Sequence, residues 1–276
     1  MPPVYHPFHL TPQGNHREVV WNPLRKRSDG YYDIDFDNLA QVCDDKCRVL
    51  LLCNPHNPGG LVWKKKTLQR LADFCMEHHL LVVSDEIHAD MPLFGHQHTP
   101  FASVSANAAA ISITFQAPTK TFNIAGIVSA YAIVPNENIR KVFYDWLAVN
   151  ELDEPHLFAP IATIAAFREG EAWCKQMIHY VERNILFVEA FCQQHMPAIK
   201  PLRPQASFLI WLDCRALHLS HEDLLHLFID EAHLALNDGE MFGPGGEGYM
   251  RLNVGCPRQL VEQALRQLCD AVQHYV

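Results

Sequence analysis

The chain has 276 residues, of which 49% are hydrophobic and 19% are charged, as in a globular protein with one large core or two modest ones. Its net charge of −9 argues against a nucleic-acid partner, which would require a basic surface. No segment has the pattern of a signal peptide, and no apolar run is long enough to cross a bilayer. We therefore expect no membrane association.

Cysteine and histidine do not indicate a metal site. The nine cysteines lack the spacing of a disulfide framework, so we expect reduced thiols and a cytoplasmic protein. Cys43 and Cys47 have a loose metal-ligand spacing, but no second pair lies nearby in the sequence. The 17 histidines are scattered. We expect no bound metal.

Short apolar runs alternate with helical patterns in the first half of the chain. Strands are predicted at 47–53, 80–88, 109–116 and 126–134, with a helix at 66–79. The strands are continuously hydrophobic rather than alternating, which is typical of strands covered on both faces. This pattern predicts an α/β fold, with a mostly parallel sheet and helices on both of its faces.

The pattern changes in the second half of the chain. From residue 135 it is helical for about sixty residues. The elements predicted after that are strands at 207–214, 233–237 and 249–255, a helix from Ser220 with a capping Asp223, and a closing helix after Pro257. This half predicts a smaller C-terminal α+β domain.

Polar residues follow three of the predicted strands. They are Asn57, Asp85, where the 80–88 segment breaks, and Lys120. Each alone has an ordinary explanation as a turn former, a helix cap or a solvated lysine. Ligands of open α/β sheets bind beyond the carboxyl ends of the strands, where all three would meet. Pyridoxal phosphate requires this combination: an amine for a Schiff base, a carboxylate for the pyridinium nitrogen and an amide for the phenolic oxygen.

Four segments carry a family resemblance. They are LLCNPHNPGGLVW, VVSDEIHADM, APTKTFNIAG and MRLNVGCPR, in this order. They resemble the motifs of fold-type I pyridoxal-phosphate enzymes, and more closely the cystathionine β-lyase, cystalysin and MalY/PatB group of the class I/II aminotransferases. The resemblance extends from PVYHPF near the start to the last helix. It implies a partial cofactor-binding large domain at 1–150, and linking helices with a C-terminal small domain at 151–276.

The resemblance also implies roles around the cofactor. Lys120 would be the catalytic lysine that carries the pyridoxal 5'-phosphate. Asp85 would pair with the pyridinium nitrogen, and Asn57 would bind the phenolic oxygen and contribute to substrate binding. His88 would lie near the ring.

Three further residues complete the implied site. Tyr5 of PVYHPF would stack on the pyridine ring, because a planar cofactor gains from an offset aromatic neighbour. Thr119 would reach the cofactor phosphate. Arg251 would bind the substrate α-carboxylate, since its planar fork matches that group, although an exposed strand arginine is the alternative.

The implied reaction is β-elimination from a sulfur amino acid such as cystathionine or cysteine, giving a thiol, pyruvate and ammonia, in a homodimer. Transamination shares removal of the Cα proton, and it stays open as one alternative. A catalytically impaired, truncated or regulatory homologue is the other alternative. Family members carry on the order of a hundred residues before the PVY segment, so this chain alone is expected to hold the cofactor weakly.

Overall fold

The computed structural model describes residues 1–275, which form two compact units. The first unit comprises Met1–Val42, His56–Leu61 and His179–Val276, and the second comprises Cys43–Pro55 and Val62–Ile178. The division of the chain into 1–150 and 151–276 stays a prediction.

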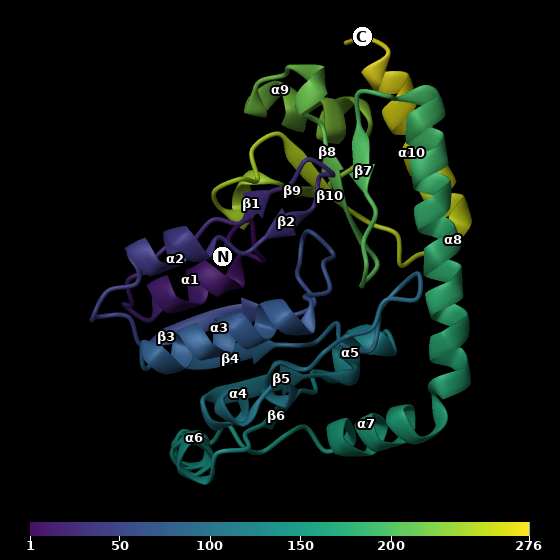
Figure 1. Cartoon of the computed structure of the whole chain (residues 1–276). Helices are drawn as coiled ribbons and strands as arrows, with labels where there is room; N and C mark the ends of the chain where they lie inside the picture. The colour runs from purple at the N-terminus through teal and green to yellow at the C-terminus, as the bar shows by residue number, and fades with distance from the viewer. Residues whose placement is uncertain (276) are drawn as a thin grey trace. The chain divides into compact units, whose positions relative to one another are not determined.

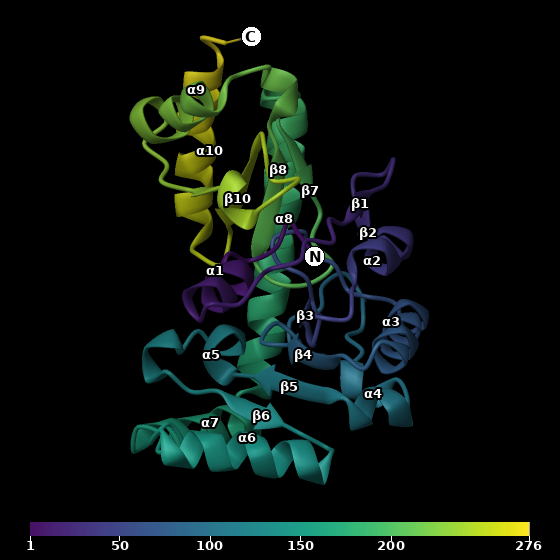
Figure 2. The same cartoon turned by 90° about the vertical axis from the view of Figure 1, so that its left-hand side faces the viewer.

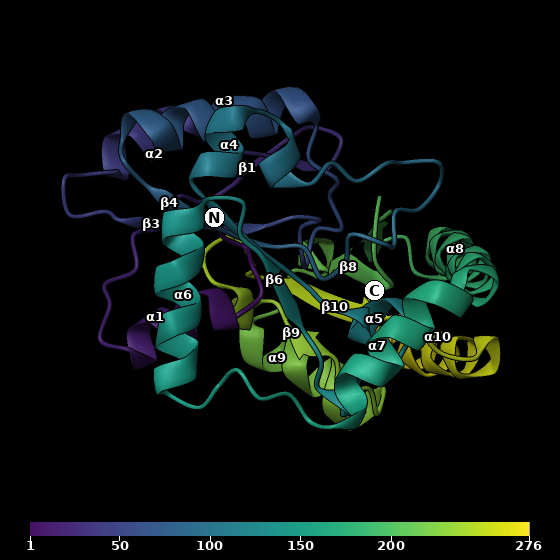
Figure 3. The same cartoon turned by 90° about the horizontal axis from the view of Figure 1, so that it is seen from below.

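The second unit is built on a four-stranded sheet with the order β3-β4-β5-β6. Its strands and helices are β3 (Val49–Cys53), α3 (Lys65–Glu77), β4 (Leu81–Asp85), α4 (Ala106–Ala110), β5 (Ser112–Gln116), α5 (Pro118–Thr121), β6 (Tyr131–Ile133), α6 (Glu137–Val149) and α7 (Phe158–Glu169). The first three strands are parallel and β6 is antiparallel to β5. Helices α3 and α4 lie together on one side of the sheet (Figures 1 and 3). The predicted α/β fold with a mostly parallel sheet is confirmed.

Sequence periodicity explains how α3 packs. Leu68, Leu71, Ala72 and Cys75 follow the spacing of one helical face, and all four are fully buried. The strands beneath are short and apolar, and Leu52 and Val82 at their centre are also fully buried. Parallel backbone pairing, from Val49 with Leu81 to Cys53 with Asp85, holds β3 and β4 side by side.

The first unit contains a second four-stranded sheet, which is antiparallel and has the order β7-β8-β10-β9. Its elements are α1 (Pro7–Gly14), β1 (Arg25–Lys26), β2 (Tyr32–Asp33), α2 (Phe36–Val42), the part of α8 (Glu171–His195) from residue 179 on, β7 (Lys200–Leu202), β8 (Leu209–Asp213), α9 (His221–His226), β9 (Asn237–Asp238), β10 (Tyr249–Asn253) and α10 (Arg258–Val272). Helices α8 and α10 run alongside each other next to this sheet (Figures 1 and 2).

Polar contacts join α8 and α10 in the first unit. Arg258 at the start of α10 donates from Nε to Asn184 Oδ1 at 2.9 Å and from Nη2 to the carbonyl of Arg183 at 2.6 Å. The fully buried Asn184 in turn donates to the carbonyl of Val254, just after β10, at 2.9 Å. The two helices and the end of β10 are thereby held in one register.

Two predicted strands differ from the structure. Of 126–134, only Tyr131–Ile133 forms a strand, because Ala125–Ile127 is a 3-10 turn and Val128 has a left-handed φ of 50°. Of 233–237, only the last residue belongs to a strand, since the backbone before it bonds to the preceding helical turn instead of to a neighbouring strand. The helix after Ser220 is confirmed, and Ser220 Oγ accepts from the Asp223 N–H at 3.1 Å.

Across residues 1–275 there is no helix with the length and apolarity needed to traverse a bilayer.

Leu71→Ala should destabilise the second unit by about 2–5 kcal/mol, because it leaves a cavity under α3 where the leucine is fully buried. The measurement is urea unfolding followed by circular dichroism. Met76→Ala on the same helix is the control, since Met76 is 41% exposed. Equal losses for the two variants would show that α3 does not pack through this face.

Candidate active site

The seven predicted site residues divide between the two units. The second unit carries Asp85, His88, Thr119 and Lys120, and the first unit carries Tyr5, Asn57 and Arg251.

Asp85 is the last residue of β4, and neighbouring strands hold its backbone. Its carbonyl accepts from the N–H of Asn54 at 2.9 Å, and its carboxylate Oδ1 accepts from the N–H of Ile87 at 3.1 Å. Within residues 1–275 the carboxylate forms no ion pair. Burial raises the pKa of Asp85 most strongly, while the Ile87 N–H and the charge of Lys120 act in the opposite direction. The result is a half-buried carboxylate whose negative charge lacks a bonded cation.

Lys120 lies in the short helix α5, directly after β5. Pro118 favours the start of this helix, because its ring presets the first helical φ and it has no N–H to satisfy. Thr121 Oγ1 donates to Asp90 Oδ2 at 3.0 Å and ties the helix to the segment after β4. In the described chain the half-buried Lys120 amine has no hydrogen bond or ion pair. An amine held in this way is available to a ligand.

His88 and Thr119 belong to the same two connections. His88 is buried in the segment after β4, and its carbonyl accepts from the N–H of Met91 at 3.1 Å. Thr119 is half-buried in α5, and its carbonyl accepts from the N–H of Ile124 at 3.1 Å. Their backbones are therefore fixed, and their roles stay predictions.

The sequence analysis did not include Glu86, a buried carboxylate next to Asp85. Glu86 is 1% exposed, and its Oε1 accepts from Ser84 Oγ at 2.8 Å and from the Phe101 N–H at 2.9 Å. Its Oε2 lies 2.8 Å from His98 Nε2. These bonds fix the end of β4 and thereby the position of Asp85. The sequence signal was a glutamate within an apolar strand pattern, which needs buried partners.

Arg251 is the charged residue among the three predicted site residues of the first unit. It lies in β10, where Nη1 donates to Asn57 Oδ1 at 2.9 Å and Nη2 donates to Asn237 Oδ1 at 2.6 Å. Its guanidinium carbon is 5.0 Å from the Phe242 ring centre and 6.0 Å from that of Tyr5. Burial lowers the pKa of Arg251. No carboxylate among the described residues pairs with it, so the guanidinium can bind an anion.

Tyr5 and Asn57 meet through the backbone. The Tyr5 N–H donates to the Asn57 carbonyl at 3.0 Å, and the turn that carries Asn57 is closed by the His56 N–H donating to Leu61 at 2.8 Å. Gly60 in this turn has a φ of +63°, and a Cβ there would lie 2.4 Å from that of Pro204. The turn therefore requires glycine, and it brings three of the predicted residues together in one unit.

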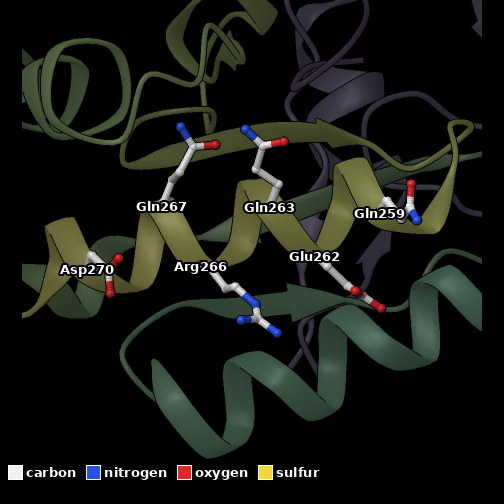
Figure 4. Close-up of a pocket in the computed structure, with 6 residues that line it drawn as sticks. All are labelled: Gln259, Glu262, Gln263, Arg266, Gln267 and Asp270. Carbon is white, nitrogen blue, oxygen red and sulfur yellow. The ribbon is translucent and has the colours of Figure 1, made fainter.

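Two hollows of the first unit are not lined by the predicted residues. A shallow depression of about 370 Å³ runs along α10 (Figure 4), and it is lined by Gln259, Glu262, Gln263, Arg266, Gln267 and Asp270. Another of about 310 Å³ includes Lys26 and Arg215, whose charges Asp213 already pairs at 2.8 and 2.7 Å. In residues 1–275 no three histidine, cysteine or acidic side chains are grouped to hold a metal.

Lys120→Met should raise the pKa of Asp85 further above its ordinary value in ligand-free protein, because it removes a positive charge that favours the carboxylate. A carbon-detected NMR titration of the aspartate carboxyl groups measures this. Lys175→Met is the control, since exposed Lys175 pairs with Glu171 instead. An unchanged pKa in the Lys120 variant would show that the two groups do not interact.

Comparisons with known proteins identify the family of this chain. The family model of aminotransferase class I and II matches residues 1–268. Cystathionine beta-lyase PatB of Bacillus subtilis is 43% identical over 272 residues, covering 98% of this chain and 70% of that protein. Protein MalY of Escherichia coli is 32% identical, covering 98% and 69%.

A solved structure is also similar along nearly the whole chain. Cystalysin from Treponema denticola, whose crystal structure contains a pyridoxal 5'-phosphate cofactor, superposes with a TM-score of 0.95 at 33% identity. The match covers 99% of this chain and 69% of cystalysin. The chain belongs to the aminotransferase class I and II family.

Proposed function

We propose that this protein is a pyridoxal-phosphate-dependent carbon–sulfur β-lyase acting on cystathionine- or cysteine-type amino acids. The observation that carries the proposal is the 43% identity with a cystathionine β-lyase across nearly the whole chain. The overall reaction converts the amino acid and water into a thiol, pyruvate and ammonia. Its substrate is a small amino acid.

The residues of the second unit fit the cofactor. Asp85 is a half-buried carboxylate without a bonded cation in the described chain, and a protonated pyridine nitrogen would supply one. The Lys120 amine is half-buried and unpaired in the described chain, as covalent attachment to the cofactor aldehyde requires. Bound pyridoxal phosphate supplies a ring that takes up the electron pair left at the substrate Cα when its proton leaves.

Four residues are proposed to hold the cofactor besides Asp85 and Lys120. Asn57 would donate to the phenolic oxygen, His88 would lie near the ring, Tyr5 would stack on the ring face, and Thr119 would bind the phosphate through its hydroxyl.

Two side chains act directly on the substrate. Arg251 binds the α-carboxylate with its guanidinium, whose present partners are neutral amide oxygens. Lys120 takes the proton from Cα as a general base. The carbon–sulfur bond at Cβ then breaks, and the sulfur leaves as the thiol product.

Aminotransfer is the second candidate function, because it needs the same carboxylate grip and the same proton removal. A catalytically impaired or regulatory homologue is the third. PatB is named a cystathionine β-lyase, whereas the name of MalY states no activity. The names of these relatives therefore do not separate the candidate functions. An assay must therefore measure both products.

Purified protein loaded with pyridoxal phosphate should release pyruvate from cystathionine without any added keto acid. Asp85→Asn should lower this rate more than about tenfold, roughly 1.4 kcal/mol in barrier, because an amide does not hold the ring nitrogen protonated. Asp73→Asn in α3 is the control, since its carboxylate only accepts from Gln69 on the surface.

The other outcomes separate the candidates. Amino-group transfer that depends on a keto acid, without pyruvate release, would identify an aminotransferase. Neither product would favour the regulatory homologue. A rate for Asp85→Asn within about tenfold of the parent would remove Asp85 from the ring-partner role.

We also propose a cytoplasmic homodimer. All nine cysteines are free thiols, as expected in a reducing compartment. Helices α6 and α7 expose a group of large apolar side chains, which is typical of an association surface. These include Val142, Trp146, Val149, Phe158, Ile161 and Ile164, each at least 49% exposed.

Sedimentation velocity should show a dimer, and Ile161→Asp should shift it toward monomer by placing a charge on this surface. Leu260→Asp on α10, also an exposed apolar position at 55%, is the control and should leave the dimer intact. A monomeric parent protein, or dimers with both variants, would contradict the assignment of this surface.

A further inference from the structure

Asn237 is the direct cross-strand neighbour of Arg251, and it lies outside the four family motifs. In the β9–β10 pair, Arg251 lies opposite Asn237, and Met250 lies opposite Asp238. Residues directly opposite in an antiparallel pair point to the same face with their Cβ atoms within about 5.5 Å. The 2.6 Å bond from Arg251 Nη2 to Asn237 Oδ1 follows from this register.

The chemistry of this contact determines the orientation of the Asn237 side-chain amide. A guanidinium only donates hydrogen bonds, so the amide must present its oxygen to Arg251. Its nitrogen then faces the thioether sulfur of Met241 at 3.7 Å. Both terminal nitrogens of Arg251 thus meet neutral oxygens, from Asn237 and from Asn57. The guanidinium is oriented, and its charge is not neutralised.

Arg251 Nε is the third nitrogen of this guanidinium. It is buried and has no hydrogen-bond partner among the described residues. A buried donor without a partner costs free energy, which a ligand with acceptor oxygens would recover. The geometry therefore holds a charged donor ready for an anion.

The carboxylate that follows Asn237 in the sequence is kept away from Arg251. Asp238 follows Asn237 in β9, and alternate strand residues point to opposite faces. Its carboxylate accepts from the Glu240 N–H at 3.2 Å and lies 3.6 Å from His221 Nε2. A slip of one residue in β9 would bring Asp238 opposite Arg251 and neutralise it.

Close backbone packing prevents that slip. Gly239 follows β9, and its N–H donates to the Tyr249 carbonyl at 2.9 Å. A Cβ on Gly239 would lie 2.0 Å from the Gly246 carbonyl oxygen and 2.4 Å from that of Tyr249. Only glycine fits there, so the position of β9 along β10 is fixed with the amide, and not the carboxylate, beside Arg251.

We propose that Asn237 is a positioning residue that holds Arg251 for a ligand carboxylate while leaving its positive charge free. It makes the protein select ligands that bring their own carboxylate. That the ligand is an amino acid substrate rests on the proposed function. An aspartate at this position would have the same shape and would form an internal ion pair that excludes the ligand.

Asn237→Asp tests this directly in the full chain loaded with pyridoxal phosphate. KM for cystathionine should rise by at least about tenfold while kcat stays within about threefold, because the variant weakens capture and leaves the reacting atoms unchanged. The affinity for propionate, a carboxylate without an amine, should fall by about the same factor in an NMR titration. That second readout requires no catalysis.

Two variants serve as comparisons. Asn253→Asp adds the same charge two residues along β10 at an exposed position, where the side chain accepts only from the Gly255 N–H, and it should change neither KM nor propionate affinity by more than about twofold. Asn237→Ala removes the hydrogen bond to Arg251 without adding a charge, so its loss of affinity should be smaller than that of Asn237→Asp.

The inference is overturned if Asn237→Asp behaves like Asn253→Asp, if Asn237→Ala is as damaging as Asn237→Asp, or if the parent protein does not bind propionate. It is also overturned if kcat falls in proportion with affinity, since that indicates general distortion. Loss of propionate binding in Asn237→Asp in a protein that does not cleave cystathionine would support the inference and refute the lyase proposal.

Discussion

The parallel register of β3, β4 and β5 is the constraint on which the second unit's chemistry depends. Cys53 pairs with Asp85, and Asp85 pairs with Phe115, so the three strands end at one edge. Because successive parallel strands present their carboxyl ends together, the residues that follow them share one rim of the sheet. Asp85 and Lys120 therefore interact electrostatically although 35 residues separate them in the sequence.

Both units keep a half-buried charged group that forms no ion pair within residues 1–275. Asp85 accepts only a backbone N–H, and Arg251 meets only amide oxygens within the described chain. Such groups cost free energy in a folded protein, and they persist where dipoles and neighbouring packing hold them in place. Here a pyridinium nitrogen and a substrate carboxylate have the complementary charges. The fold thus holds in advance two charged groups that suit the proposed cofactor and substrate roles.

Local patterns in the sequence predicted much of the second unit. Asp85 and Lys120 could be found because each follows a continuously apolar strand, and the edge rule for parallel strands then brings them together. The strand at 126–134 was overpredicted, since apolar residues around Gly126 form a 3-10 turn. Apolar composition alone does not distinguish these two backbones.

The residues missed by the sequence analysis depend on long-range pairing. Asn237 acquires its contact with Arg251 from the register of β9 against β10, and a strand of two residues has no periodicity to reveal it. Glu86 acquires its partners from His98 and Phe101, which lie 12 and 15 residues further along the chain. Neither contact follows from local spacing, because loop conformation and strand register decide which side chains meet.

The central claim is that Lys120 carries the cofactor, and chemical labelling tests it most directly. Protein incubated with pyridoxal phosphate is reduced with borohydride, digested, and its peptides are mapped by mass spectrometry. The account predicts one stable pyridoxyl label, on the peptide that contains Lys120, and its loss in Lys120→Met. A label on another lysine, such as those in the exposed group Lys64, Lys65 and Lys66, with Lys120 unmodified, would contradict it.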